Sequence, residues 1–253
     1  MSKSFDIKKL CDESLDELFS KEYFESRIKR KELKNNAEPL YSDLDRRIAF
    51  IVHAVTIRSG IILEKIYYNQ IKNCCLHLDV WSEEKFKISK HAMQLASDQD
   101  NKDVINTDLP YGETYKIGKK RKKTRQIDLL TYDKSKKTLN SYEIKRGGGH
   151  HDSEKQEKII EDLFTVRLLL KSYGERIHNL NVKKARSYVI SHMNRDLFAP
   201  EYRKFVVKGK DLNIHFNSSN LKQNIELGVN YFASEFKRRF RIIKIEAMKD
   251  LTN

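Results

Sequence analysis

The segment from Thr124 to Gly149 constrains the fold more than any other part of this chain. Its alternating apolar and polar residues predict two strands joined by a tight, lysine-rich turn. Asp128 is expected on the first strand, and Glu143 and Lys145 on the second. Residues two apart on a strand share a face, so the hairpin would gather two carboxylates and an amine. Carboxylates are ligands for a hard divalent cation.

The sequence period changes sharply after this hairpin. Gly147–Gly149 stand where the backbone must turn or approach another group closely, although a strand-to-helix crossover could need them for geometry alone. Ser153 and Gln156 then form a capping box that predicts a helix, which is expected to stop at Gly174. The strand expected at Ala185–Met193 is reached through this helix and should run parallel to its predecessor.

The segments before and after the hairpin and its following helix predict further elements. Residues 1–40 are highly charged with a broken apolar pattern, which predicts an N-terminal helical arm that either grips a partner or packs on the core edge. Residues 41–253 are expected to form the main domain. Further predicted elements are a helix from Ser42 that Ser59-Gly60 interrupts, a strand at Leu76–Trp81, a helix at Ser82–Asp98 with Ser82 as N-cap, a loop at 98–113, a strand or hairpin at Phe205–Phe216, and a helix at Leu221–Phe240.

Charge narrows the choice of partner. The chain has 50 Lys and Arg against 36 Asp and Glu, a net charge of +14, so nucleic acid is the leading partner. An anionic membrane is the competing interpretation, but no apolar run of about 18 residues occurs. The N-terminus has no apolar signal region, which favours a cytoplasmic protein. Three cysteines, two of them adjacent, give neither a disulfide framework nor a zinc motif.

The pattern Glu-x-Lys occurs four times, so spacing alone selects nothing. Glu32 and Glu235 lie in helical patterns, where residues two apart point in different directions. Glu83 has only Asp79 shortly before it, too close for a strand, a turn and a returning strand. Glu143 alone is expected on a strand whose partner strand carries an acidic residue. The alternative is a set of salt-bridge partners on a solvated sheet face, which would be weak.

Asp128, the run Glu143-Ile144-Lys145 and the upstream helical Gly60-x-x-x-Glu64 together resemble the PD-(D/E)xK nuclease superfamily, and within it most closely a type II restriction endonuclease. The resemblance covers roughly residues 45 to 193. It departs from the family pattern at Ile127, where a proline is usual before the aspartate. It implies an α/β fold with a mixed central sheet flanked by helices, an αβββαβ core with an N-terminal helical extension, and a nuclease domain at residues 41–253.

The resemblance also implies a set of functional residues. Asp128 and Glu143 would bind Mg²⁺ with the backbone carbonyl of Ile144, and Glu64 would act through water or on a second metal. Lys145 would position the attacking water or stabilise charge on the phosphate. The residues expected to bind DNA phosphates are Lys119, Lys120, Arg121, Lys122, Lys123, Arg125, Arg146, His150, His151 and Lys155, although the basic run could equally be a solvated turn.

The expected activity is therefore Mg²⁺-dependent hydrolysis of double-stranded DNA, by a homodimer if both strands of a symmetric site are cut. Two alternatives stay open. One is a structure-specific or transposon-type nuclease that nicks DNA. The other is a non-catalytic DNA-binding protein on a nuclease-like core.

Overall fold

A computed structural model divides the chain into two units, one of residues 1–66 and 223–253 and the other of residues 67–222. The predicted boundary between residues 40 and 41 lies outside the described part of the chain and stays a prediction. The structure describes residues 6–20, 43–97, 107–112, 116–117, 121–122, 124–146, 153–193 and 198–249.

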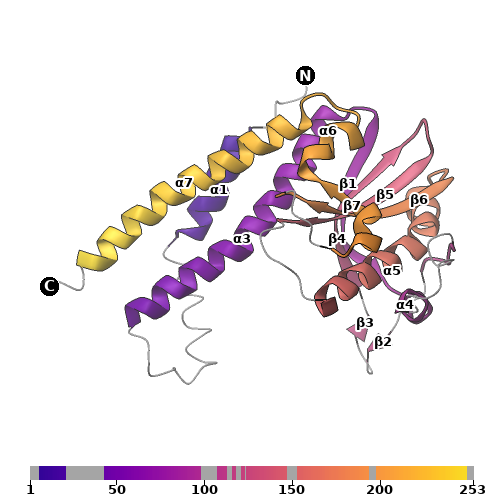
Figure 1. Cartoon of the computed structure of the whole chain (residues 1–253), viewed down its shortest axis with the longest axis horizontal. Helices are drawn as coiled ribbons and strands as arrows, with labels where there is room; N and C mark the ends of the chain where they lie inside the picture. The colour runs from indigo at the N-terminus through magenta and orange to yellow at the C-terminus, as the bar shows by residue number, and fades with distance from the viewer. Residues whose placement is uncertain are drawn as a thin grey trace. The chain divides into compact units, whose positions relative to one another are not determined.

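The second unit is built on a mixed sheet, which has five strands among the described residues (Figure 1). The strand order is β1-β4-β5-β6-β7. β1, β4 and β5 are antiparallel neighbours, whereas β6 runs parallel to β5 and β7 parallel to β6. The strands are β1 (Leu78–Lys87), β4 (Thr124–Asp133), β5 (Thr138–Lys145), β6 (Lys184–Ser191) and β7 (Val206–Lys208), with β2 (Lys116–Ile117) and β3 (Arg121–Lys122) forming a separate pair.

Helix α5 (Ser153–His178) connects β5 to β6 and packs on one face of the sheet together with α4 (Lys90–Ser97). The core beneath them contains Leu130, Leu139 and Tyr173, all essentially inaccessible to solvent. The chain order is therefore helix, three strands, helix and parallel strand, as predicted for an αβββαβ core, with α4 inserted after the first strand. This confirms the predicted α/β class with a mixed sheet flanked by helices.

The opposite face of the sheet packs against α6 (Leu212–His215). The hydroxyl of the buried Tyr142 lies 3.0 Å from Nε2 of His215, and its ring contacts Phe216. Burial, and secondarily the charge of Arg186, lowers the pKa of His215 to about 4, so this imidazole is neutral at pH 7. The strand or hairpin predicted at Phe205–Phe216 is in fact the short β7 followed by helical turns.

The first unit is helical. It contains α1 (Ile7–Leu18), α3 (Asp43–Cys74) through Ile66, and α7 (Leu221–Lys249) from Gln223. Cys11 and Leu15 of α1 and Ile62 of α3 are buried. Arg239 of α7 pairs with Asp12 of α1 at 3.1 Å. The stripe predicted at Leu221–Phe240 is confirmed as a helix that buries Leu221, Ile225 and Phe232.

Three predicted element boundaries are wrong. Ser59-Gly60 does not interrupt α3, which is continuous. Ser82 lies inside β1, where Phe86 is buried against the sheet core, and Ser89 caps α4 instead through an Oγ that accepts from the Ala92 N–H at 3.1 Å. Helix α5 continues four residues past Gly174 to His178.

No helix in the described part of the chain is long and apolar enough to cross a membrane.

Candidate functional site

A β-bulge positions the first acidic residue of the predicted site. Trp81 pairs with Leu130, and Glu83 pairs with Ile127. Between these two pairs β1 has one intervening residue and β4 has two. The extra residue forms a bulge in β4 that contains Asp128. Ile127 and Leu130 on either side of it both reach the core under α5. Bulges bend a strand and redirect its side chains, and this one directs the Asp128 carboxylate to β5.

Asp128 contacts the centre of the Glu-x-Lys run. The Ile144 N–H donates to Asp128 Oδ2 at 2.8 Å, and Ile144 lies between Glu143 and Lys145. The β4–β5 register agrees, since its last pair is Leu129 with Tyr142, and Asp128 and Glu143 are the next residues beyond this pair on the two strands. The structure therefore brings together three of the four predicted catalytic residues.

Glu143 and Lys145 form an ion pair along β5. Lys145 Nζ lies 2.6 Å from Glu143 Oε1, and the two side chains are 33% and 34% exposed. At this exposure an ion pair contributes only about 0–1 kcal/mol to folding. The ion pair therefore contributes little to the stability of the fold. The ammonium group of Lys145 is exposed enough to contact an anion that approaches the two carboxylates.

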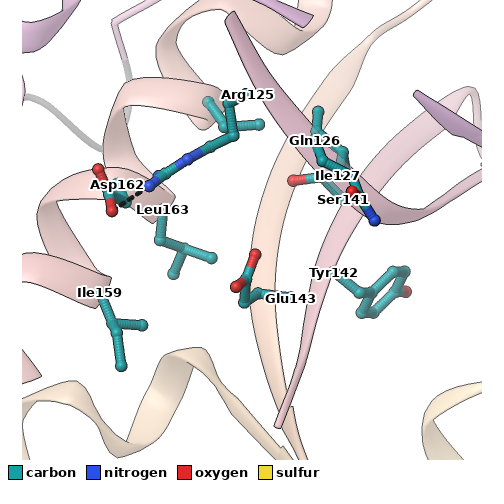
Figure 2. A pocket seen from close by; sticks show the side chains of 10 residues that line it. Arg125, Gln126, Ile127, Ser141, Tyr142, Glu143, Ile159, Asp162 and Leu163 are labelled. Carbon is teal, nitrogen blue, oxygen red and sulfur yellow. Dashed lines mark hydrogen bonds and ion pairs between the residues drawn. The ribbon is translucent and has the colours of Figure 1, made fainter. Parts of the chain in front are cut away.

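Glu143 also borders a small pocket of about 40 Å³ between the sheet and α5 (Figure 2). Across this pocket Arg125 of β4 forms an ion pair with Asp162 of α5. Arg125 was predicted to bind DNA and here is held by a carboxylate. Asp162 is a pocket residue that the sequence argument missed. The one sequence feature that points to Asp162 is its spacing: it follows Ile159 by three residues and so lies on the same face of α5, the face towards the sheet.

Glu64 belongs to the first unit, whereas Asp128, Glu143 and Lys145 belong to the second. It lies on α3, half-buried, between the buried Leu63 and Ile66. The apolar surround predicted for Glu64 is confirmed. Its participation in the site stays a prediction.

The predicted phosphate contacts are only partly described. Arg146, directly after β5, and Lys155, in the first turn of α5, are both exposed. Arg121 and Lys122 form β3. Residues Lys119, Lys120, Lys123, His150 and His151 lie outside the described residues.

The donor set fits magnesium better than zinc. Within the described ranges, no group of three or more His, Cys, Asp or Glu side chains is placed to hold a metal ion. Zinc sites use three or four such ligands, whereas Mg²⁺ commonly takes one or two carboxylates and completes its shell with water and phosphate oxygens. Asp128 and Glu143, on adjacent strands and joined through Ile144, are the two carboxylates that could supply that smaller set.

Comparisons of this chain with protein-family models, with curated proteins and with solved structures find no match. Its mixed sheet flanked by helices is compatible with a PD-(D/E)xK fold and also with other α/β folds. Any functional assignment therefore depends on the chemistry of the hairpin site.

Proposed function

We propose that this protein is a Mg²⁺-dependent endonuclease of the PD-(D/E)xK type that hydrolyses phosphodiester bonds of double-stranded DNA, most like a type II restriction enzyme. The observation that carries the proposal is the 2.8 Å hydrogen bond from the Ile144 N–H to Asp128. It fixes a second carboxylate beside Glu143 and Lys145. The net charge of +14 supports a polyanionic substrate.

In the proposed reaction Asp128 and Glu143 would hold Mg²⁺, and the bound ion would supply Lewis-acid chemistry to the scissile phosphate and to a water molecule. The bulge and the Ile144 hydrogen bond keep the Asp128 carboxylate in one orientation, so little reorganisation is needed when substrate arrives. Lys145 exchanges its contact with Glu143 for the phosphate, where its ammonium stabilises the negative charge of the transition state.

Active-site variants test the proposal. Purified protein should cleave supercoiled plasmid in Mg²⁺ and not in EDTA. Asp128→Asn, Glu143→Gln and Lys145→Ala should each lower the cleavage rate by about 100-fold or more, the usual cost of removing one transition-state contact. Their affinity for the same DNA, measured by anisotropy without divalent metal, should change little. Lys85→Ala is the matched control, because Lys85 ends the other strand-borne Glu-x-Lys run.

The products separate the competing functions. Discrete double-strand ends at one short symmetric sequence support a restriction enzyme. Nicked circles without linear product favour the nicking alternative, and DNA binding without any cleavage favours the non-catalytic one. Cleavage that survives both Asp128→Asn and Lys145→Ala would overturn the assignment of the site.

A further inference from the structure

A second, larger cavity lies along the first part of β6. It measures about 520 Å³, and its lining includes five cationic side chains and one acidic side chain. Lys184, at its start, pairs with Thr138, whereas Glu143 of the candidate site pairs with Val189, five residues further along the strand. Lys184 therefore lies about 17 Å along the strand from Val189, and the lining extends from Lys184 to Tyr188, the residue next to Val189. We call this cavity the basic cleft; its cations are Arg167, Lys183, Lys184, Arg186 and Lys204.

The basic cleft follows an open edge of the sheet. Within the described residues β7 pairs with β6 only from Val189 to Ser191. The preceding part of β6, from Lys184 to Tyr188, has no strand on that side in the described structure and lines the cleft. An exposed edge carries backbone N–H and C=O groups, so it offers donors to an anion in addition to the side chains. Lysines on an edge strand also prevent it from pairing with a strand of another chain. That protective role would not require a cavity beside the lysines.

Most of the cations of the basic cleft have no ion-pair partner among the described residues. Asp108 is the acidic lining residue, and it is bound by Arg167 at 2.9 Å and by Lys171 at 3.2 Å. Lys183, Lys184 and Lys204 make no ion pair within the described ranges. Like charges held together in this way repel one another, and a bound anion relieves that repulsion.

Aromatic rings lie among the cations. Phe164 of α5 and Phe205 meet edge to face, with ring centroids 5.1 Å apart. Lys204 Nζ lies 5.1 Å from the Phe205 ring centroid. Both rings are half-buried and line the basic cleft. The ring of Tyr188, which also lines it, is already stacked on Tyr142, with ring centroids 5.7 Å apart. Cations beside partly exposed rings suit a ligand that carries both a phosphate and a flat base.

We propose that the basic cleft binds a phosphorylated nucleoside, either within a single strand of nucleic acid or as a free nucleotide. Its volume falls in the range of small-ligand sites, about 300–1,000 Å³, and far exceeds what inorganic phosphate needs. The lysines bind the phosphate, and Phe205 stacks on the base. The proposal does not rest on the nuclease assignment, since it uses none of the hairpin residues.

Charge reversal in a cleavage-deficient background tests it. In Lys145→Ala protein without divalent metal, the double variant Lys184→Glu/Lys204→Glu should weaken binding of a short labelled single-stranded oligonucleotide at least tenfold, measured by anisotropy. The control Lys85→Glu/Lys90→Glu makes the same charge change at exposed positions on β1 and α4, and should weaken binding less than threefold. Lys184 and Lys204 are exposed, so folding should be preserved; the alanine pair replaces the glutamates if the melting temperature falls.

Competition identifies the ligand and its source. Nucleoside monophosphates should displace the oligonucleotide, and Phe205→Leu should weaken both by several-fold while leaving inorganic phosphate unaffected. Equal affinity for oligonucleotide and nucleotide marks a free-nucleotide site, and a strong preference for the oligonucleotide marks a strand site. The proposal is overturned if both charge-reversal variants lose affinity equally, if inorganic phosphate competes as well as nucleotides, or if only an acidic peptide binds.

Discussion

At the scale of single residues, the hairpin turn depends on Asp133. Its Oδ1 accepts from the Ser135 N–H at 3.0 Å, the Ser135 hydroxyl at 2.6 Å and the Lys136 N–H at 3.0 Å. Burial by itself would raise the pKa of this carboxyl, but the hydrogen bonds from Ser135 and Lys136 outweigh it and lower the pKa to about 2. Lys137, at the end of the same turn, has a positive φ of 53°.

Asp133 should therefore make stability depend on pH. Because its folded pKa lies below the ordinary 3.8, its contribution is complete above about pH 4 and is lost as the pH falls towards 2. Asp133→Ala should lower the free energy of unfolding by about 2 kcal/mol at pH 7, and by progressively less between pH 4 and pH 3. Urea unfolding at several pH values measures this, with Glu84→Gln on the exposed side of β1 as control. A deficit that stays constant with pH contradicts the assignment.

Some features of the site could be predicted from the sequence, and others could not. Strand alternation and the Glu-x-Lys spacing placed Asp128, Glu143 and Lys145 together, because both depend on local sequence. The bulge that aims Asp128 was not predictable, since it arises from the register of β1, a strand that begins 50 residues earlier. Asp162 was missed for a similar reason: only the packing of α5 on the sheet brings it to Arg125.

At the scale of elements, Gly174 shows why a correct signal gave a wrong boundary. Glycine often ends helices, yet here it lies buried inside α5 where the helix approaches β5. A Cβ at Gly174 would come within 2.6 Å of Leu139 and 2.9 Å of Val182, both buried side chains. The residue is small for packing, a constraint that depends on the partner strand and leaves no trace in the local sequence.

Two glycines in helix interiors allow a matched experiment. Gly174→Ala should lower the free energy of unfolding by about 1–2 kcal/mol, because the cost of overpacking exceeds the gain in helix propensity. Gly60→Ala should raise it by about 0.5–1 kcal/mol, since among the described residues no atom outside the adjoining helix backbone lies within 4 Å of the new methyl group. Thermal or urea unfolding of both variants decides the matter. Equal stabilisation by both substitutions would show that Gly174 is not tightly packed.

At the scale of the whole molecule, the order of elements was predictable and the division into units was not. Periodicity identified the long helices, the hairpin and the parallel strand, and their order defines the α/β class. The two units do not follow the order of the sequence. Residues 223–253 belong to the same unit as residues 1–66, although the whole sheet unit lies between them in the sequence. Such an association depends on contacts such as the ion pair between Arg239 and Asp12, which no local pattern predicts.

The net charge of +14 gives the last prediction, which concerns the molecule rather than one site. Each phosphate that a lysine or arginine neutralises releases condensed counterions, so duplex affinity should fall steeply with salt. Contact with about six phosphates would lower the association constant roughly 1,000-fold between 50 and 200 mM NaCl. Anisotropy titrations on a labelled duplex in EDTA measure this slope. Arg146→Gln and Lys155→Gln should each reduce the slope by about one, whereas Lys85→Gln should leave it unchanged; a flat salt dependence would mean that the excess charge is not used to bind DNA.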